Sequence, residues 1–161
     1  MVDRILKALI SAIVGLIALL YVAHNLANIG EAFAFFTYTT SHADQTAYPV
    51  TLLPVPPPFL IVVAMVLVFA LEAAAGVLCL YGGWRLFALR GADAGAFERG
   101  KAISKIGLGC AVLNWWGLFQ GIAVAGYQLW QMPLGEGPMM GSWIYGGIAM
   151  ASLIYISQRG D

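Results

Sequence analysis

The stretch "FLIVVAMVLVFALEAAAGVLCL", residues 59–80, decides the fold, because it is almost wholly apolar and contains a single charged residue, Glu72. A membrane-spanning helix needs about 20 consecutive apolar residues, and this stretch is long enough. Comparable stretches occur three more times along the chain. We therefore predict an all-α membrane protein, a bundle of four transmembrane helices that forms one domain over residues 1–161, with spans at residues 5–29, 59–84, 102–127 and 141–156.

The composition supports a membrane protein. The chain has 161 residues, of which 61% are hydrophobic and 10% charged, whereas soluble domains carry about 25% charged residues. A soluble chain of this size could not remove so much apolar surface from water, so membrane lipids are expected partners. The formal net charge is zero, which gives no electrostatic reason to expect nucleic-acid binding.

The charged residues predict the orientation. The eight lysine and arginine residues all lie on one side of the four-span arrangement, and they are Arg4, Lys7, Arg85, Arg90, Arg99, Lys101, Lys105 and Arg159. The opposite loops carry Glu31, Asp44 and Glu136 as their charged residues. Because basic loops remain in the cytoplasm, we expect both termini there and the long first loop in the periplasm. A three-span or five-span arrangement would scatter the basic residues over both sides.

The two outer loops are rich in aromatic residues. Phe35 and Phe36 lie near the start of the long first loop, and Trp130 lies in the second. Such side chains are typical of membrane–water interfaces and of protein contacts. Two interpretations stay open: the loops are interfacial lids, or together they form a docking surface for another subunit.

Small residues recur at four-residue spacing in three spans, for example at Gly76 and at Gly117 and Gly121. Helices in lipid associate by close backbone approach, so these positions mark helix contacts. The sequence leaves open whether those contacts are made within the chain or between chains. Cys79 and Cys110 fall inside apolar runs and are interpreted as small core residues, and we expect no metal site.

Intramembrane polar residues form two predicted layers. A helix rises about 1.5 Å per residue, and counting from the predicted cytoplasmic ends places Glu72, Asn114 and Tyr145 at a common depth near the middle of the bilayer. An outer layer, which is a possible site of ligand contact, comprises His24, Asn25, Asn28 and Gln120. His24, Asn28 and Glu31 are spaced i, i+4, i+7, which predicts one shared helix face.

Glu72 is the most informative of these residues. A charge at the bilayer centre costs roughly 2.5–3.5 kcal/mol on insertion scales and is by default a functional hypothesis. The chain offers no lysine or arginine at that depth, so we expect the neutral acid, which can donate a hydrogen bond to Asn114 or Tyr145. Contact with a basic group or cofactor of another protein, and a role in proton transfer, remain alternatives.

The residues predict no cofactor, although bound lipid is expected. A bis-histidine haem needs two facing histidines within the bundle, whereas the chain has His24 in a span and His42 in the outer loop. Quinone contact near His24, Gln120 and the Trp115–Trp116 pair remains an alternative.

Four segments carry a resemblance: "NIGEAFAFF" (28–36), "LEAAAGVLCLYGGWRL" (71–86), "FERGKA" (97–102) and "GYQLWQMPLGEGP" (126–138). Over nearly its whole length the chain resembles an uncharacterised bacterial family of predicted small integral membrane proteins, domain of unknown function family 2165. The resemblance implies four transmembrane helices in the bacterial inner membrane. It implies no established activity and transfers no catalytic residue.

Small size, little mass outside the membrane and aromatic outer loops favour a non-enzymatic accessory or structural subunit of a larger inner-membrane complex, respiratory or transport-related. We expect no enzyme activity, because no catalytic constellation is recognisable. Two alternatives are retained. One is a stand-alone channel or transporter, acting as a homo-oligomer with Glu72 on the path, and the other is a redox anchor that binds quinone or haem.

Overall fold

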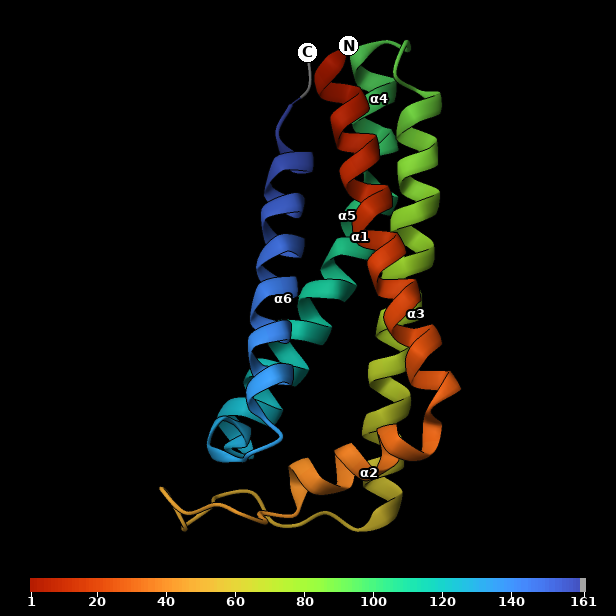
Figure 1. The fold of residues 1–161 in the computed structure, drawn as a ribbon. Coiled ribbons are helices and arrows are strands. Elements are labelled where there is room, and N and C mark those ends of the chain that lie inside the picture. The colour runs from red at the N-terminus through yellow and green to blue at the C-terminus, as the bar shows by residue number, and fades with distance from the viewer. Residues whose placement is uncertain (160–161) are drawn as a thin grey trace.

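A computed structural model describes residues 1–159 and consists mainly of four long helical rods (Figure 1). The helices long and apolar enough to cross a membrane are Val2–Ala27, Pro58–Ala88, Ala94–Gly126 and Glu136–Ser157. The all-α fold with four spans is thereby confirmed, although each helix extends a few residues beyond at least one predicted boundary. The first, second and fourth rods are α1 (Val2–Ala27), α3 (Pro58–Ala88) and α6 (Glu136–Ser157).

The third rod is built from three segments. These are α4 (Ala94–Gly100), α5 (Ala102–Val112) and η1 (Leu113–Gly126), and η1 is a π-helix. The sequence predicts a single helix over residues 102–127, and nothing in its pattern signals a change of helix type. Because π-helices are rare and frequently occur at functional sites, we expect a functional site in the half of the bundle that contains η1.

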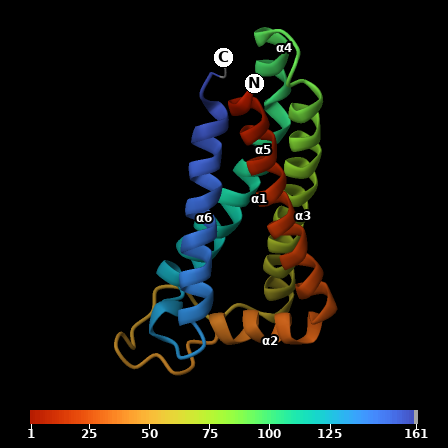
Figure 2. The ribbon, with the colours of Figure 1, turned by 45° about the horizontal axis from the view of Figure 1, so that its top comes forward.

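The first outer loop contains a helix that the sequence analysis did not predict, α2 (Ile29–Thr40). The backbone of Asn28 leaves the helical conformation, with φ −122° and ψ 46°, and α1 ends there. After this break α2 turns away from α1 and runs across the end of the bundle (Figures 1 and 2). His24, Asn28 and Glu31 therefore do not share one continuous helix face, and that prediction is wrong.

The two outer loops are bonded to each other. The side-chain oxygen of Gln131, in the short 3-10 helix η2 (Leu129–Gln131), accepts from the backbone N–H groups of Ala47 at 2.9 Å and Tyr48 at 3.0 Å. Gln45 Nε2 donates to the carbonyl of Tyr127 at 2.7 Å. Residues 41–57 and 127–135 therefore form one outer cap, and both interpretations of the loops, as lids and as a docking surface, stay open.

Close packing at small residues joins the rods. A Cβ atom added at Gly15 of α1 would lie 2.8 Å from the carbonyl oxygen of Gly76 in α3. A Cβ atom at Gly107 of α5 would lie 2.7 Å from Cys79 Sγ. These small residues make contacts within the chain. Gly117 and Gly121 of η1 differ, because both are exposed.

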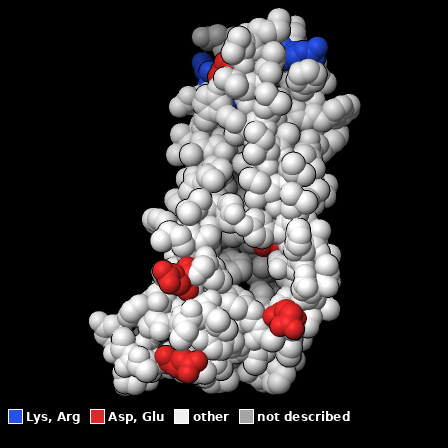
Figure 3. All heavy atoms as spheres, in the orientation of Figure 1, with Lys and Arg blue, Asp and Glu red and all other residues white. Residues whose placement is uncertain are grey.

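Charges separate the two ends of the molecule. Basic side chains lie at the end where α1 begins and α6 ends, which we call the basic end, together with some of the acidic ones (Figures 1 and 3). Further acidic side chains lie toward the opposite end, which we call the acidic end (Figure 3). Lys7 and Lys101 are almost fully buried, and both donate to the carbonyl of Gln158, at 2.7 and 2.6 Å. Asp3 and Glu98 pair with these two lysines, so part of the basic end is a bonded cluster rather than a solvated surface.

Candidate functional site: a cavity at the acidic half of the bundle

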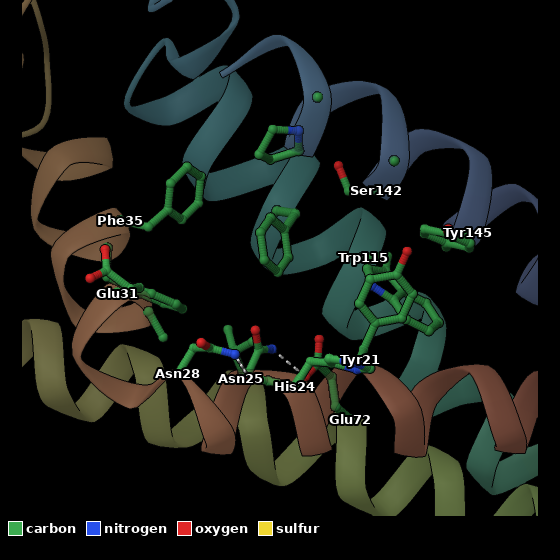
Figure 4. Close-up of a pocket in the computed structure, with 17 residues that line it drawn as sticks. Tyr21, His24, Asn25, Asn28, Glu31, Phe35, Glu72, Trp115, Ser142 and Tyr145 are labelled. Carbon is green, nitrogen blue, oxygen red and sulfur yellow. Dashed lines mark hydrogen bonds between the residues drawn. The ribbon is translucent and has the colours of Figure 1, made fainter. Parts of the chain in front are cut away.

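A cavity of about 500 Å³ lies among α1, α2, α3, η1 and α6. It forms because η1 and α6 diverge from α1 and α3 toward the acidic end, while α2 crosses below them (Figures 1 and 2). Figure 3 shows a hollow in the surface of this half of the molecule, with acidic atoms in it. Aromatic rings and polar side chains line it in equal number, six of each among 17 residues (Figure 4).

Glu72 lies at the deep side of the cavity, with 3% of its surface exposed. Its Oε2 atom accepts from Asn25 Nδ2 at 3.1 Å, and its Oε1 atom accepts from Asn114 Nδ2 at 3.4 Å. Glu72 therefore joins α1, α3 and η1 as an acceptor at both oxygens. The predicted donation from a neutral Glu72 acid to Asn114 or Tyr145 is wrong, because Asn114 is the donor and Asn25 takes the second oxygen. The second amide atom of Asn114, Oδ1, is buried and has no hydrogen-bond partner.

This network differs in part from the two predicted layers. The contact between Glu72 and Asn114 agrees with the common depth inferred from the sequence, but Tyr145 lines the same cavity without a hydrogen bond to either. Asn25 was placed in the outer layer, whereas it bonds directly to Glu72. This difference arises because the depth of each residue was counted along the backbone as if the helices were straight and parallel. Such a count neglects the tilt of the helices and the length of the glutamate side chain.

Three aromatic rings pack together beside Glu72. Tyr21 of α1 lies edge-to-face on Tyr145 of α6, with ring centroids 4.9 Å apart, and Trp115 of η1 lies 5.6 Å from Tyr145. Trp115 also belongs to a buried cluster with Ala18, Ala75, Ala111 and Ala149. These small residues pack tightly on the side of the basic end, so the cavity ends at this layer.

A row of polar groups leads from Glu72 toward α2. Asn25, Asn28 and Glu31 line the cavity, as does His24, and Figure 4 shows their side chains between the deep end and the rim. The His24 Nδ1 atom donates to the carbonyl of Leu20 at 2.8 Å, and Asn28 Nδ2 donates to the carbonyl of His24 at 2.9 Å. The break after α1 thus brings residues of two helices into one site.

Other residues singled out from the sequence lie elsewhere or act differently. Gln120 Nε2 donates to Ser142 Oγ at 2.8 Å and to the carbonyl of Met139 at 2.7 Å, so it joins η1 to α6 and is separate from the asparagines of α1. Phe35 and Phe36 are half-buried and line the cavity. Trp130 is 42% exposed in the outer cap and packs edge-to-face on Tyr48.

Sequence reasoning missed Tyr21 and Ser142 as cavity residues. Tyr21 lies four residues before Asn25 on the same helix face, and that spacing could have identified it. Ser142 gave no comparable signal. His24 and His42 lie on α1 and in the outer cap, where His42 Nε2 donates to the carbonyl of Leu53 at 2.7 Å. Within residues 1–159, no group of three or more His, Cys, Asp or Glu side chains could hold a metal ion.

A second, apolar cavity of about 240 Å³ lies between α2, α3 and η1. Four residues border both cavities, and they are Phe35, Phe36, Val68 and Phe119. The second cavity is lined almost wholly by carbon, with Thr39 and Thr40 among its few polar residues. An aromatic wall therefore separates a cavity with polar groups from an apolar one.

The fold and the cavity define a small integral membrane protein with four apolar spans and a chamber near one end. The chain belongs to the family described as predicted small integral membrane protein (DUF2165), whose profile matches residues 3–159. No curated protein and no solved structure gives a match. The family resemblance noted in the sequence is confirmed.

Proposed function

We propose that this protein is a non-enzymatic membrane protein that binds a small membrane-soluble molecule in the cavity beside Glu72. The cavity itself carries the proposal. Its volume of about 500 Å³ falls in the range of about 300–1,000 Å³ that is typical of ligand sites. It also brings aromatic rings and polar side chains together in one concave site.

The surroundings of the cavity support binding rather than passage. The hollow reaches the surface of the bundle, so a molecule can enter without separation of the spans (Figure 3). At the other side, the cluster of Trp115 and four alanines is buried. A channel or transporter with Glu72 on its path would require this cluster to open. A quinone belongs to the class of molecules that the cavity suits, because amide and phenol groups of the lining can donate to its carbonyl oxygens.

The test is to fill the cavity. Gly141 lines it, and a Cβ atom there would lie 3.7 Å from Tyr145, an ordinary contact distance. The Gly141→Leu variant should therefore fold and occupy the site. Gly109→Leu is the matched control, because a Cβ atom there meets nothing within 4 Å and Gly109 lies outside the cavity.

Native mass spectrometry of the protein, released from lipid nanodiscs, gives the readout. Wild type and Gly109→Leu should retain a bound non-protein mass that Gly141→Leu lacks. Equal retention by all three proteins, or no bound mass in wild type after growth in rich medium, would contradict the proposed site.

The role of accessory subunit in a larger respiratory or transport complex is a second candidate. It is favoured by the exposed Gly117, Gly121 and Ala125 of η1, small residues at a spacing that lets another helix approach closely. Extraction in mild detergent from the native host should then yield stoichiometric larger proteins. Gly117→Leu should lose them and Gly109→Leu should keep them, whereas recovery of the protein alone would refute this role.

We also propose that the protein lies in a bacterial inner membrane with both termini in the cytoplasm. The support is the gathering of lysine and arginine at the end where α1 begins and α6 ends (Figures 1 and 3). A green fluorescent protein fused at the C-terminus should fluoresce, and alkaline phosphatase at the same position should be inactive. The reverse pattern would overturn the orientation.

A further inference from the structure

We propose that the molecule bound beside Glu72 is an organic cation, a membrane-soluble amine or quaternary ammonium whose charged group lies between the Glu72 carboxylate and the aromatic rings. The inference rests on the proposed function and specifies its ligand class. It depends on three independent features of the cavity: the sign of its charges, the free acceptor capacity of Glu72 and the arrangement of its rings.

Carboxyl groups supply the acidic side chains of the lining. Glu72 and Glu31 contribute two carboxyl groups, and the residues that line the cavity in the described structure include no lysine or arginine. The basic side chain on the lining is His24, which is exposed and whose Nδ1 atom donates to the carbonyl of Leu20 at 2.8 Å. The ion pairs found within residues 1–159 are Lys7–Asp3 and Lys101–Glu98, both at the basic end. Glu72 is thus a buried acid without a cation from its own chain, and buried charges in proteins are normally paired. An anionic ligand would meet two like charges.

The hydrogen bonds of Glu72 leave room for a donor. Each carboxylate oxygen has two lone-pair directions, and each oxygen accepts one amide N–H, from Asn25 and Asn114. One direction per oxygen therefore remains for a ligand N–H or for the positive charge of a quaternary ammonium. The two amides fix the carboxylate from the side of α1 and from the side of η1, so it is oriented before the ligand arrives.

The rings complete a site for a cation. Tyr21, Trp115 and Tyr145 pack together within 6.3 Å of one another, centroid to centroid, and all three line the cavity. Ring faces attract ammonium groups within about 6 Å, most strongly when water is excluded. The Phe35, Phe36 and Phe119 rings that line the same cavity offer an apolar surface to the hydrocarbon part of the molecule.

Three probes of equal chain length test the charge: tetradecylamine, tetradecanol and tetradecanoic acid. Binding to protein in nanodiscs of neutral phosphatidylcholine is measured by calorimetry against empty nanodiscs. We expect the amine to bind at least about tenfold more tightly than the alcohol, and the acid to bind most weakly. Glu72→Gln should weaken amine binding by about tenfold and leave alcohol binding unchanged.

The controls separate charge from folding and from general surface potential. Glu136→Gln removes one acid at the same end of the molecule, outside the cavity, and should not alter amine binding. Glu31 is exposed at the rim of the cavity, and Glu31→Gln should weaken amine binding about twofold to fivefold. This variant keeps the charge testable even if Glu72→Gln fails to fold.

The outcomes also distinguish this inference from the proposed function. Equal binding of amine and alcohol, blocked for both by Gly141→Leu, would overturn the cation and keep the cavity as a site. If none of the three probes binds, and Gly141→Leu and Gly109→Leu retain the same non-protein mass, both the cation inference and the proposed function are overturned. Tighter binding of tetradecanoic acid than of tetradecylamine would overturn the cation inference and leave the cavity as a ligand site.

Discussion

Replacement of Glu72 by leucine tests the network that ties α1, α3 and η1 together. The change removes the acceptor of two amide donors, Asn25 Nδ2 at 3.1 Å and Asn114 Nδ2 at 3.4 Å. A buried donor left without a partner costs about 1–3 kcal/mol. Asn25 borders the cavity and can turn toward it, whereas Asn114 is 0% exposed. We therefore count the full cost for Asn114 alone and expect a loss of about 2 kcal/mol in the free energy of unfolding.

Glu72→Gln should behave differently, because the amide preserves the number of hydrogen bonds. Its oxygen can still accept from Asn25, and its NH₂ group can donate to Asn114 Oδ1, which has no partner in the wild type, once the Asn114 amide turns over. The unpaired atom of Asn114 is then Nδ2 instead of Oδ1, so the number of unpaired atoms is unchanged. The expected change is within about 0.5 kcal/mol of wild type. The comparison of the two variants thus separates the loss of hydrogen bonding from the loss of charge.

Equilibrium unfolding in mixed micelles of dodecyl maltoside and dodecyl sulfate, followed by helical circular dichroism, measures both variants. Glu136→Leu serves as the control for loss of an acid at an exposed position. Equal stability of Glu72→Leu and wild type would refute the structural role of the network. A loss of about 2 kcal/mol in Glu72→Gln would show that the charge, rather than the hydrogen bonds, stabilises the bundle.

Three further predictions concern other parts of the chain. Gly76→Leu should prevent assembly of a monodisperse protein, because an added Cβ atom already lies 2.5 Å from a leucine side chain of α1, while Gly109→Leu should behave as wild type in size-exclusion chromatography. Replacement of both Lys7 and Lys101 by methionine should speed amide hydrogen exchange in the last turn of α6 about tenfold, because both Nζ atoms donate to the carbonyl of Gln158; unchanged exchange would contradict this. The Asp93 carboxyl caps α4, and the N–H of Ala96, which donates to it, lowers its pKa. The cap therefore stabilises α4 fully at a pH above the pKa of an unfolded aspartate, and this stabilisation is lost as the pH falls through the lowered pKa. A carbon NMR titration that gives an unshifted pKa for Asp93 would refute this prediction.

The features predicted well from the sequence are those that lipid imposes directly. A span must be long and apolar, so the run around Glu72 and its three counterparts identified the four rods. The one-sided placement of the basic residues matches their common end in the structure (Figure 3). The contact between Glu72 and Asn114 followed from depth alone, because the rise per residue of a helix varies little.

The features missed depend on the rotation of each helix about its axis. Residues after Leu113 lie in a π-helix, whose i→i+5 hydrogen bonds change the direction in which successive side chains point. Gln120 bonds to Ser142 of α6, whereas counting of depth along the helices predicts it in one layer with the polar residues of α1. In the same way, the backbone break at Asn28 sets the direction of α2, and apolar periodicity carries no information about it.

These two irregularities create the cavity. The break at Asn28 carries Glu31 and Phe35 across the end of the bundle, and η1 presents Trp115 and Phe119 from the opposite side. Both irregular segments thus border the chamber beside Glu72. Glu72, which has no lysine or arginine beside it, therefore lies where the backbone is irregular. The spans pack closely at Gly15, Gly76 and Gly107, whereas a cavity surrounds the Glu72 carboxyl group.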